Sequence, residues 1–198
     1  MFPFFAMLFR MKYINRWALM RNTTTENLSE HAMEVAAITH FLCLIHNKRF
    51  GGHLDAGRGA VIGLFNDCTE ILTGDLPTPV KYHDEALRSS YKQMEKEAAA
   101  RMVKMLPGEL REEYEGLLQP TEGDETLWKL CKGADKLCAL IKCMEHEKMG
   151  NGEFSNAKRA TLQSLEALNL PEVGVFMEEY LPAFALNLDE LHQLEGEE

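Results

Sequence analysis

Three carboxylates, those of Asp67, Glu70 and Asp75, occur within the segment LFNDCTEILTGDLPTP (Leu64 to Pro79), which begins as an apolar helical run and ends in a proline-rich turn. Asp67 keeps the spacing of three and four residues that separates the apolar residues around it, so it is predicted to face the core. An unpaired carboxylate buried there would cost several kcal/mol or become protonated. We therefore expect Asp67 to meet a cation, a hydrogen-bond network or solvent.

Polar side chains also occupy the apolar stripes of two other helical segments. His31 is in register with the apolar residues that follow it, and Asp135 lies between Cys131 and Cys138. One imidazole and two carboxylates from three helices suit a divalent cation, whose charge offsets their own. A lone histidine on such a face is more often a hydrogen-bonded core residue, and the carboxylates could form an ordinary buried salt bridge. The spacing alone is compatible with both interpretations.

The sequence predicts that helices carry His31, Asp67 and Asp135. Apolar residues recur at spacings of three and four in five long segments, whereas the alternation typical of strands persists nowhere. The breaks between the segments carry Gly, Pro, Asn or Asp. The sequence therefore predicts an all-α fold, a single-domain helical bundle over residues 1–198. The expected helices cover Ser29–Asn47, Asp55–Leu72, Tyr82–Leu106, Glu125–Met149 and Asn156–Leu168.

The composition limits the classes of function. The 198 residues are 45% hydrophobic and carry 31 acidic against 21 basic residues, a net charge of −10, which argues against binding of nucleic-acid polymers or anionic membranes. One core and one domain suit this length, with a homodimer as an option. Five cysteines without a CxxC pair indicate reduced, packed thiols, so we expect a cytoplasmic protein without a disulfide framework.

The apolar start MFPFFAMLFRMKYINRW is predicted to be a first helix rather than a targeting peptide. Arg10 and Lys12 follow the apolar run instead of preceding it, and no small-residue cleavage site comes after it. No later stretch approaches the roughly 18 uninterrupted apolar residues that a membrane span needs. The sequence therefore predicts no membrane segment.

Four ordered motifs, INRWALMRN, ENLSEHAMEVA, NDCTEILTGDLPTPVKY and GADKLCALIKC, resemble those of the HD-domain phosphohydrolases, most closely the bacterial 5′-deoxynucleotidases. The resemblance runs from about Arg10 to about Leu188, nearly the whole chain. A His-Asp pair alone would be a weak signal, whereas four motifs in order with the GDLPTPVK signature are specific. The resemblance implies an all-helical, usually homodimeric enzyme that binds one divalent metal ion (Co, Mn or Mg).

Where the motifs match, the resemblance also implies which residues bind the metal, take part in catalysis and bind the substrate. They are, for the metal, His31, Asn66, Asp67 and Asp135; for catalysis, Glu70 and Arg16; and for substrate binding, Arg16, Trp17, Asp75, Leu76, Pro77 and Thr78.

The chemistry of these side chains agrees with the implied reaction. Glu70 comes one helical turn after Asp67 and could handle the proton of a metal-bound water or of the leaving alkoxide. A divalent ion lowers the pKa of a bound water toward neutrality and polarises a phosphoryl oxygen. Arg16 could clamp the phosphate with its planar fork, and Asp75 could accept a hydrogen bond from a sugar hydroxyl. By resemblance, the turn crowds a 2′-hydroxyl and so favours deoxy substrates.

Taken singly, the same residues have ordinary structural interpretations. Glu70 could be a solvated helix carboxylate, Arg16 a surface cation and Trp17 a core aromatic residue, while Asp75 could simply complete a turn. The order of the motifs favours the functional roles. No partner pattern accompanies the remaining histidines, which are His40, His46, His53, His83, His146 and His192.

Asn66 departs from the family pattern, which has histidine at this position of the His-Asp doublet. A carboxamide oxygen is neutral like imidazole, but it is harder and a weaker donor to Mn, Fe, Co or Zn, so metal affinity should fall. Three interpretations fit the sequence. Asn66 could mark a natural variant that is active with an altered metal preference, a natural variant that has lost catalysis, or an engineered substitution.

The predicted function is hydrolysis of the 5′-phosphate from deoxyribonucleoside 5′-monophosphates by attack of a metal-bound water. One alternative is a catalytically impaired HD-fold module that binds nucleotides or regulates because of Asn66. Another is a helical interaction protein whose inward carboxylates form salt bridges. The sequence does not indicate base preference, the physiological metal or activity on di- or triphosphates.

Overall fold

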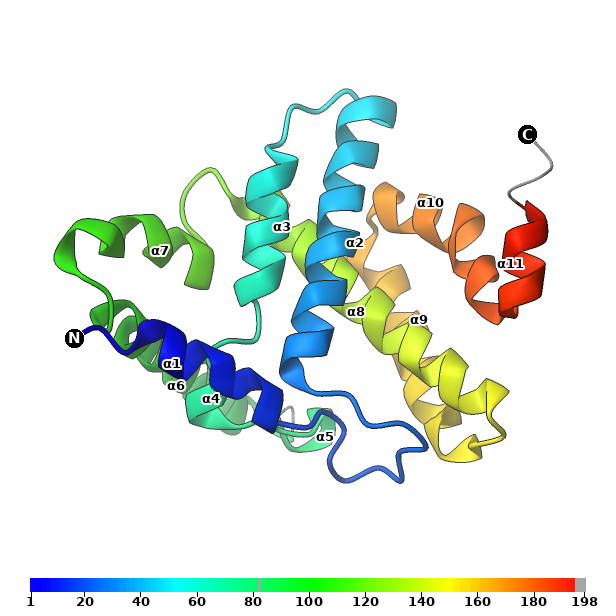
Figure 1. The fold of residues 1–198 in the computed structure, drawn as a ribbon, viewed down its shortest axis with the longest axis horizontal. Coiled ribbons are helices and arrows are strands. Elements are labelled where there is room, and N and C mark those ends of the chain that lie inside the picture. Colours follow the sequence, from blue (N-terminus) through cyan, green and yellow to red (C-terminus); the bar gives the residue numbers. More distant parts are fainter. Residues whose placement is uncertain (82, 195–198) are drawn as a thin grey trace.

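The computed structural model describes residues 1–81 and 83–194, which form an all-helical fold (Figure 1). Within these residues no strand occurs, and one isolated antiparallel bridge joins Asn15 and Asn27. The α-helices are α1 (Phe4–Leu8), α2 (Leu28–Arg49), α3 (Ala56–Phe65), α4 (Glu70–Thr73), α5 (Thr78–Lys81), α6 (Glu85–Lys104), α7 (Arg111–Leu118), α8 (Glu125–Lys148), α9 (Ser155–Leu168), α10 (Pro171–Glu179) and α11 (Leu188–Leu194). The predicted all-α class is confirmed.

Helices α2, α3 and α8 form the centre of the fold, with α3 beside α2 and α8 crossing behind them (Figure 1). One apolar cluster joins these three helices to α9 and α10. A second cluster packs α1, α6 and α7 against the start of α2 and the end of α3. Gly63 permits the close approach of α3 to α2, because a Cβ atom there would lie 2.8 Å from the Cα atom of Ala36.

A capping box fixes the start of α2. The side chain of Asn27 accepts hydrogen bonds from the backbone N–H groups of Ser29 and Glu30, and the Glu30 carboxylate accepts one from the N–H of Asn27. This motif satisfies the free N–H groups of the first turn and defines where the helix begins. It therefore sets the rotation at which His31, one turn later, enters the core.

The prediction of one continuous helix over Asp55–Leu72 is wrong. Helix α3 ends at Phe65, four residues form turns, and α4 begins at Glu70. In this break, backbone N–H groups bond three residues back, as from Cys68 to Phe65 and from Glu70 to Asp67. Such tighter bonds replace the α-helical pattern. Asp67 therefore lies in a turn rather than on a helical face.

The remaining helix predictions differ mainly at the edges. The first segment is helical only over α1 and continues as a 3₁₀-helix from Phe9 to Tyr13 before an extended stretch. Helices α5, α7, α10 and α11 were not predicted, and α5 begins at Thr78, where the sequence indicated a turn. His46 and His146, for which no partner was predicted, both have one: His46 Nδ1 lies 2.6 Å from Glu172 Oε1, and the His146 ring stacks on Phe154.

Helix α2 is long and apolar enough to cross a membrane by length and composition alone, although charged residues such as Glu30 and Glu34 interrupt it. Its inward side chains, including Val35 and Leu42, are fully buried against α3 and α8. Its apolar composition is therefore explained by its position at the centre of the core. All five cysteines are buried and unpaired, as expected.

An ion pair between α3 and the start of α8 gives a test of pH-dependent stability. The Arg58 guanidinium donates to both carboxylate oxygens of Asp124, and this hydrogen bonding lowers the pKa of Asp124 below its usual value. The pair should therefore stabilise the fold above about pH 4, the pKa region of an unfolded aspartate, and lose this contribution as the pH falls through the lower folded pKa. Asp124→Asn should cost about 1 kcal/mol at pH 7.

Urea unfolding at pH 7 and at pH 3 measures this effect. The difference in unfolding free energy between Asp124→Asn and the unaltered protein should shrink at the lower pH, whereas Glu122→Gln, an exposed control nearby, should change little at either pH. An equal difference at both pH values would refute the assignment.

Candidate functional site

Side chains of His31 and two aspartates meet where α2, the turn after α3, and α8 come together. His31 Nε2 lies 3.0 Å from Asp135 Oδ1 and 3.4 Å from Asp67 Oδ2. Nitrogen and oxygen atoms of the three residues all lie within 4.8 Å of one another. The structure thus brings together three of the four predicted metal ligands, although they come from separate parts of the chain.

Burial and mutual contacts shift the pKa values of all three side chains in this cluster. His31 is fully buried, and although burial disfavours a charged ring, the surrounding carboxylates raise the pKa of His31 to about 9. Burial raises the pKa of Asp67, while the His31 contact holds the pKa of Asp135 at about 2 against the effect of burial. The side chain of Asp135 is 32% exposed, so the carboxylate side of the cluster is open to solvent.

Asn66, the fourth predicted ligand, lies next to the cluster at the end of α3. Its amide Nδ2 donates a hydrogen bond of 2.9 Å to Asp67 Oδ1. A cavity of about 420 Å³ opens beside Asn66 and Asp135, with Trp128, Lys129 and Lys132 of α8 in its lining. The cluster therefore has an entrance whose wall carries two exposed lysines.

Arg16 reaches the same place from a turn in the loop that precedes α2. Its Nη1 donates a hydrogen bond of 2.6 Å to Glu26 Oε1, and its Nη2 lies 3.8 Å from Asp135 Oδ1. Burial works against its charge, but the neighbouring carboxylates raise the pKa of Arg16 above its ordinary value. A permanently charged, forked donor thus stands beside the cluster, and it suits a phosphate.

Glu70, at the start of α4, is only 9% exposed. Burial and the negative charges of Asp67 and Asp75 raise the pKa of Glu70 to about 9. The carboxyl group therefore carries a proton at neutral pH. A proton-bearing carboxyl group next to the aspartates is what a general acid requires.

The predicted substrate turn follows α4 directly. Gly74 has a φ of 78°, a conformation that glycine adopts without strain, and its carbonyl accepts a hydrogen bond of 3.2 Å from the Tyr91 hydroxyl. Asp75, Leu76 and Pro77 are half-buried. The side chain of Thr78 lies outside the described residues.

Trp17 is placed differently from the other predicted substrate residues. Its φ of 57° is strained for a residue with a Cβ atom, and its ring packs 5.6 Å, between centroids, from that of Phe154 beyond the end of α8. Its indole Nε1 is buried without a hydrogen-bond partner in the described part of the chain. The structure therefore does not show Trp17 in contact with the His31 cluster.

Glu26 and Lys142 were missed from the sequence. Glu26 Oε1 lies 3.2 Å from His31 Nδ1, and Glu26 Oε2 lies 3.1 Å from Lys142 Nζ. The signal was present in the quoted motif ENLSEH, whose first residue is Glu26, but a residue just outside a helix has no periodicity to mark it.

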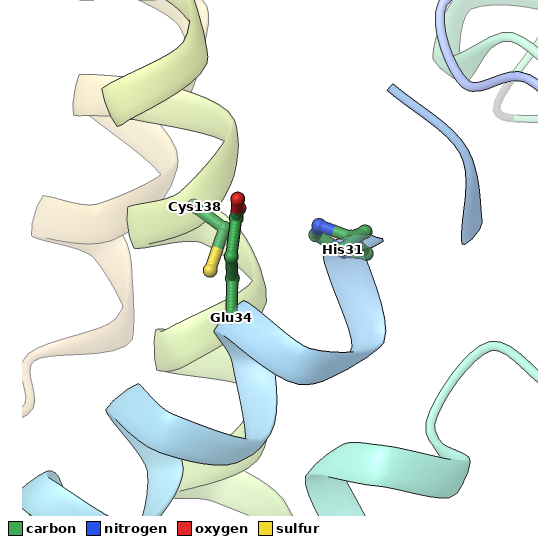
Figure 2. Close-up of side chains that lie close together, drawn as sticks. All are labelled: His31, Glu34 and Cys138. Atoms are coloured by element: carbon green, nitrogen blue, oxygen red, sulfur yellow. The ribbon is translucent and has the colours of Figure 1, made fainter. Parts of the chain in front are cut away.

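A second group of potential ligands shares His31. Figure 2 shows His31 beside Glu34, from the next turn of α2, and Cys138 of α8. Burial raises the pKa of the Cys138 thiol, so the sulfur stays protonated and is a poor ligand at neutral pH. The set with Asp67 and Asp135 is therefore the better candidate metal centre, because its carboxylates suit hard cations.

The fold is that of an HD-domain phosphohydrolase. A solved structure of such a protein from Listeria innocua matches with a TM-score of 0.80 and 23% identity, covering 98% of this chain and 96% of that chain. A family profile described as 5′-deoxynucleotidase YfbR-like matches residues 3–184. The chain therefore belongs to the YfbR-like 5′-deoxynucleotidase family.

Two relatives illustrate how far the similarity extends. A 5′-deoxynucleotidase of Erwinia tasmaniensis is 46% identical over 190 residues, which cover 96% of each chain. A protein of Photorhabdus temperata named 5′-deoxynucleotidase yfbR is 44% identical over 188 residues, which cover 95% of each chain. The family resemblance expected from the four motifs is confirmed over nearly the full length.

Proposed function

We propose that the protein is a metal-dependent hydrolase that removes the 5′-phosphate from deoxyribonucleoside 5′-monophosphates. The observation that carries this proposal is the convergence of His31, Asp67 and Asp135, from separate elements, on one point beside Arg16. Membership of the 5′-deoxynucleotidase family supplies the substrate class.

A single divalent cation, Co, Mn or Mg, would be held by His31, Asp67 and Asp135, with Asn66 as a further candidate ligand. The donors fit such an ion, because one imidazole nitrogen and two carboxylates with atoms within 4.8 Å of one another are the kinds of ligand that these cations bind. When bound, the ion supplies a Lewis acid for the phosphoryl oxygen and lowers the pKa of water.

The protein's own groups would bind and orient the phosphate. The Arg16 guanidinium is fixed by Glu26 on one side, which leaves its other edge near Asp135 for the phosphoryl oxygens. Lys129 and Lys132, in the wall of the adjacent cavity, favour the approach of an anion. A fixed guanidinium stabilises the charge of the transition state without having to reorganise.

Glu70 would move the proton at the leaving group. Because it is protonated at neutral pH, it can donate to O5′ of the deoxynucleoside as the P–O5′ bond breaks. Asp75 would accept a hydrogen bond from a sugar hydroxyl, and Leu76, Pro77 and Thr78 would complete the wall of the sugar pocket. Trp17 would contribute to substrate binding, as the family motif implies.

The wider setting forms part of the same proposal. Residues 1–198 would act as one HD-type domain, as a homodimer, without a nucleic-acid or membrane partner. Two observations support a soluble cytoplasmic enzyme: the apolar face of α2 is buried in the core, and the five cysteines are unpaired.

Phosphate release tests the proposal. Protein purified without chelator would be analysed for metal and then assayed on deoxy- and ribonucleoside 5′-monophosphates with Mg²⁺, Mn²⁺ or Co²⁺. We expect a bound divalent ion and phosphate release that favours the deoxy substrates. Absence of both metal and turnover would refute the proposal.

A catalytically impaired nucleotide-binding module is the second candidate. The observation that favours it is the Asn66 amide, which meets Asp67 through its nitrogen rather than presenting a second imidazole to the cluster. Binding of deoxynucleotides without phosphate release under all three metals would support this candidate over the enzyme.

Asn66→His should strengthen metal binding and raise the rate together. Imidazole is a better donor than a carboxamide to Mn²⁺ or Co²⁺, so we expect metal affinity to rise about tenfold, the scale on which changes around ligands usually act. Calorimetric titration of Mn²⁺ and the phosphate-release assay measure the two effects. If neither value changed, Asn66 would lie outside the metal's ligand set.

A further inference from the structure

Glu26 brings three cations from three separate elements together on one carboxylate. Its side chain is 11% exposed, and it lies just before the first turn of α2. Oε1 accepts from Arg16 Nη1 at 2.6 Å and lies 3.2 Å from His31 Nδ1, while Oε2 lies 3.1 Å from Lys142 Nζ. One oxygen is therefore shared by the residue proposed to bind phosphate and the residue proposed to bind metal.

The backbone holds this arrangement in place. The N–H of Arg16 donates to the carbonyl of Glu26 at 2.9 Å, and the N–H of Leu28 donates to the carbonyl of Ile14 at 3.0 Å. These bonds hold the loop that carries Arg16 against the segment that carries Glu26. Since the capping box at Asn27 fixes the start of α2, Arg16, Glu26 and His31 are set relative to one another before any ligand binds.

Lys142 is the third basic partner of this buried carboxylate. The lysine side chain is 8% exposed, and it contacts the oxygen that Arg16 and His31 leave free. A buried carboxylate without such partners would cost several kcal/mol. Arg16, His31 and Lys142 together therefore offset the cost of burying the Glu26 carboxylate.

An anion at Nδ1 has a defined effect on the imidazole. It favours the proton on Nδ1, so that a metal ion would displace the proton of Nε2, the atom that faces Asp67 and Asp135, and would bind there. The same anion fixes the Arg16 fork in advance, so that less side-chain freedom is lost when phosphate binds.

We propose that Glu26 is a positioning residue that holds the metal ligand His31 and the phosphate-binding Arg16 on one carboxylate oxygen, so that metal affinity and phosphate affinity both depend on it. The inference rests on the proposed function. It adds a residue through which the metal and phosphate positions are linked.

Glu26→Gln tests this inference, because it keeps the size of the side chain and removes its charge. We expect calorimetric titration of Mn²⁺ to show an affinity about 10 to 100 times weaker, the usual effect of losing a group that orients a metal-binding histidine. Inorganic phosphate should also bind about tenfold more weakly at saturating Mn²⁺, since Arg16 loses its anchor. Glu145→Gln is the matched control, because Glu145 lines the same cavity as Glu26 and Lys142.

Thermal unfolding separates positioning from stability. A lower unfolding temperature with unchanged Mn²⁺ and phosphate affinities would overturn the inference, as would equal losses in Glu26→Gln and Glu145→Gln. If Glu26→Gln did not fold, Glu26→Asp would carry the test, since it keeps the charge for Lys142 but draws the carboxylate away from His31, and the same weakening is expected. Absence of Mn²⁺ binding in the unaltered protein would instead refute the proposed function.

Discussion

Glu70→Gln is expected to lower kcat by about 10² to 10⁴, the range that a positioned general acid contributes. Glutamine has nearly the same shape, but it has no proton to give to O5′. The carboxyl group of Glu70 holds its proton because burial and the charges of Asp67 and Asp75 raise its pKa to about 9. Phosphate release at saturating deoxynucleotide and metal measures kcat directly.

Two controls isolate the proton transfer from binding. Mn²⁺ affinity should stay close to that of the unaltered protein in Glu70→Gln, because Glu70 is not among the three converging ligands. Glu97→Gln, on the exposed face of α6, should leave kcat unchanged. An undiminished kcat in Glu70→Gln would remove Glu70 from the mechanism.

Arg16→Ala is expected to lower kcat/KM by about 10² to 10³, comparable to the loss of one preorganised donor from a transition-state site. The guanidinium is the forked cation closest to Asp135, and its contact with Glu26 fixes it there. Arg16→Lys should recover only part of the loss, because an ammonium keeps the charge but not the two-pronged geometry.

Arg21→Ala is the comparison for this prediction. Arg21 lies on the same loop, but its side chain is exposed and pairs with Glu153 rather than with the cluster. It should therefore retain full kcat/KM. Similar losses of kcat/KM in Arg16→Ala and Arg21→Ala would indicate that the substitutions act by disturbing the structure of the loop, and would contradict a direct role of Arg16 in phosphate binding.

Periodicity predicted the convergence of His31, Asp67 and Asp135 correctly, although for Asp67 the local reason was different. His31 and Asp135 lie on helical faces that turn inward, as their spacing indicates. Asp67 lies in a turn between two short helices, which still delivers its carboxylate to the same point. Tertiary packing against α2 and α8 determines where α3 stops, and a period of three and four residues does not report that packing.

Glu26 shows what the sequence could not reveal about the site. Its role depends on a loop that folds back so that Arg16 and Glu26 become neighbours, and no helical or strand period marks such a loop. The same limitation applies to Trp17, whose unusual backbone conformation and packing against Phe154 follow from that loop rather than from its neighbours in sequence.

Titration of Mn²⁺ into metal-free protein, comparing the unaltered chain with Asp67→Asn and Asp135→Asn, tests the central claim most directly. The account predicts one ion per unaltered chain and a large loss of affinity in each variant, because each removes a charged oxygen from the converging set. Equal binding in all three proteins would place the metal elsewhere and contradict the account.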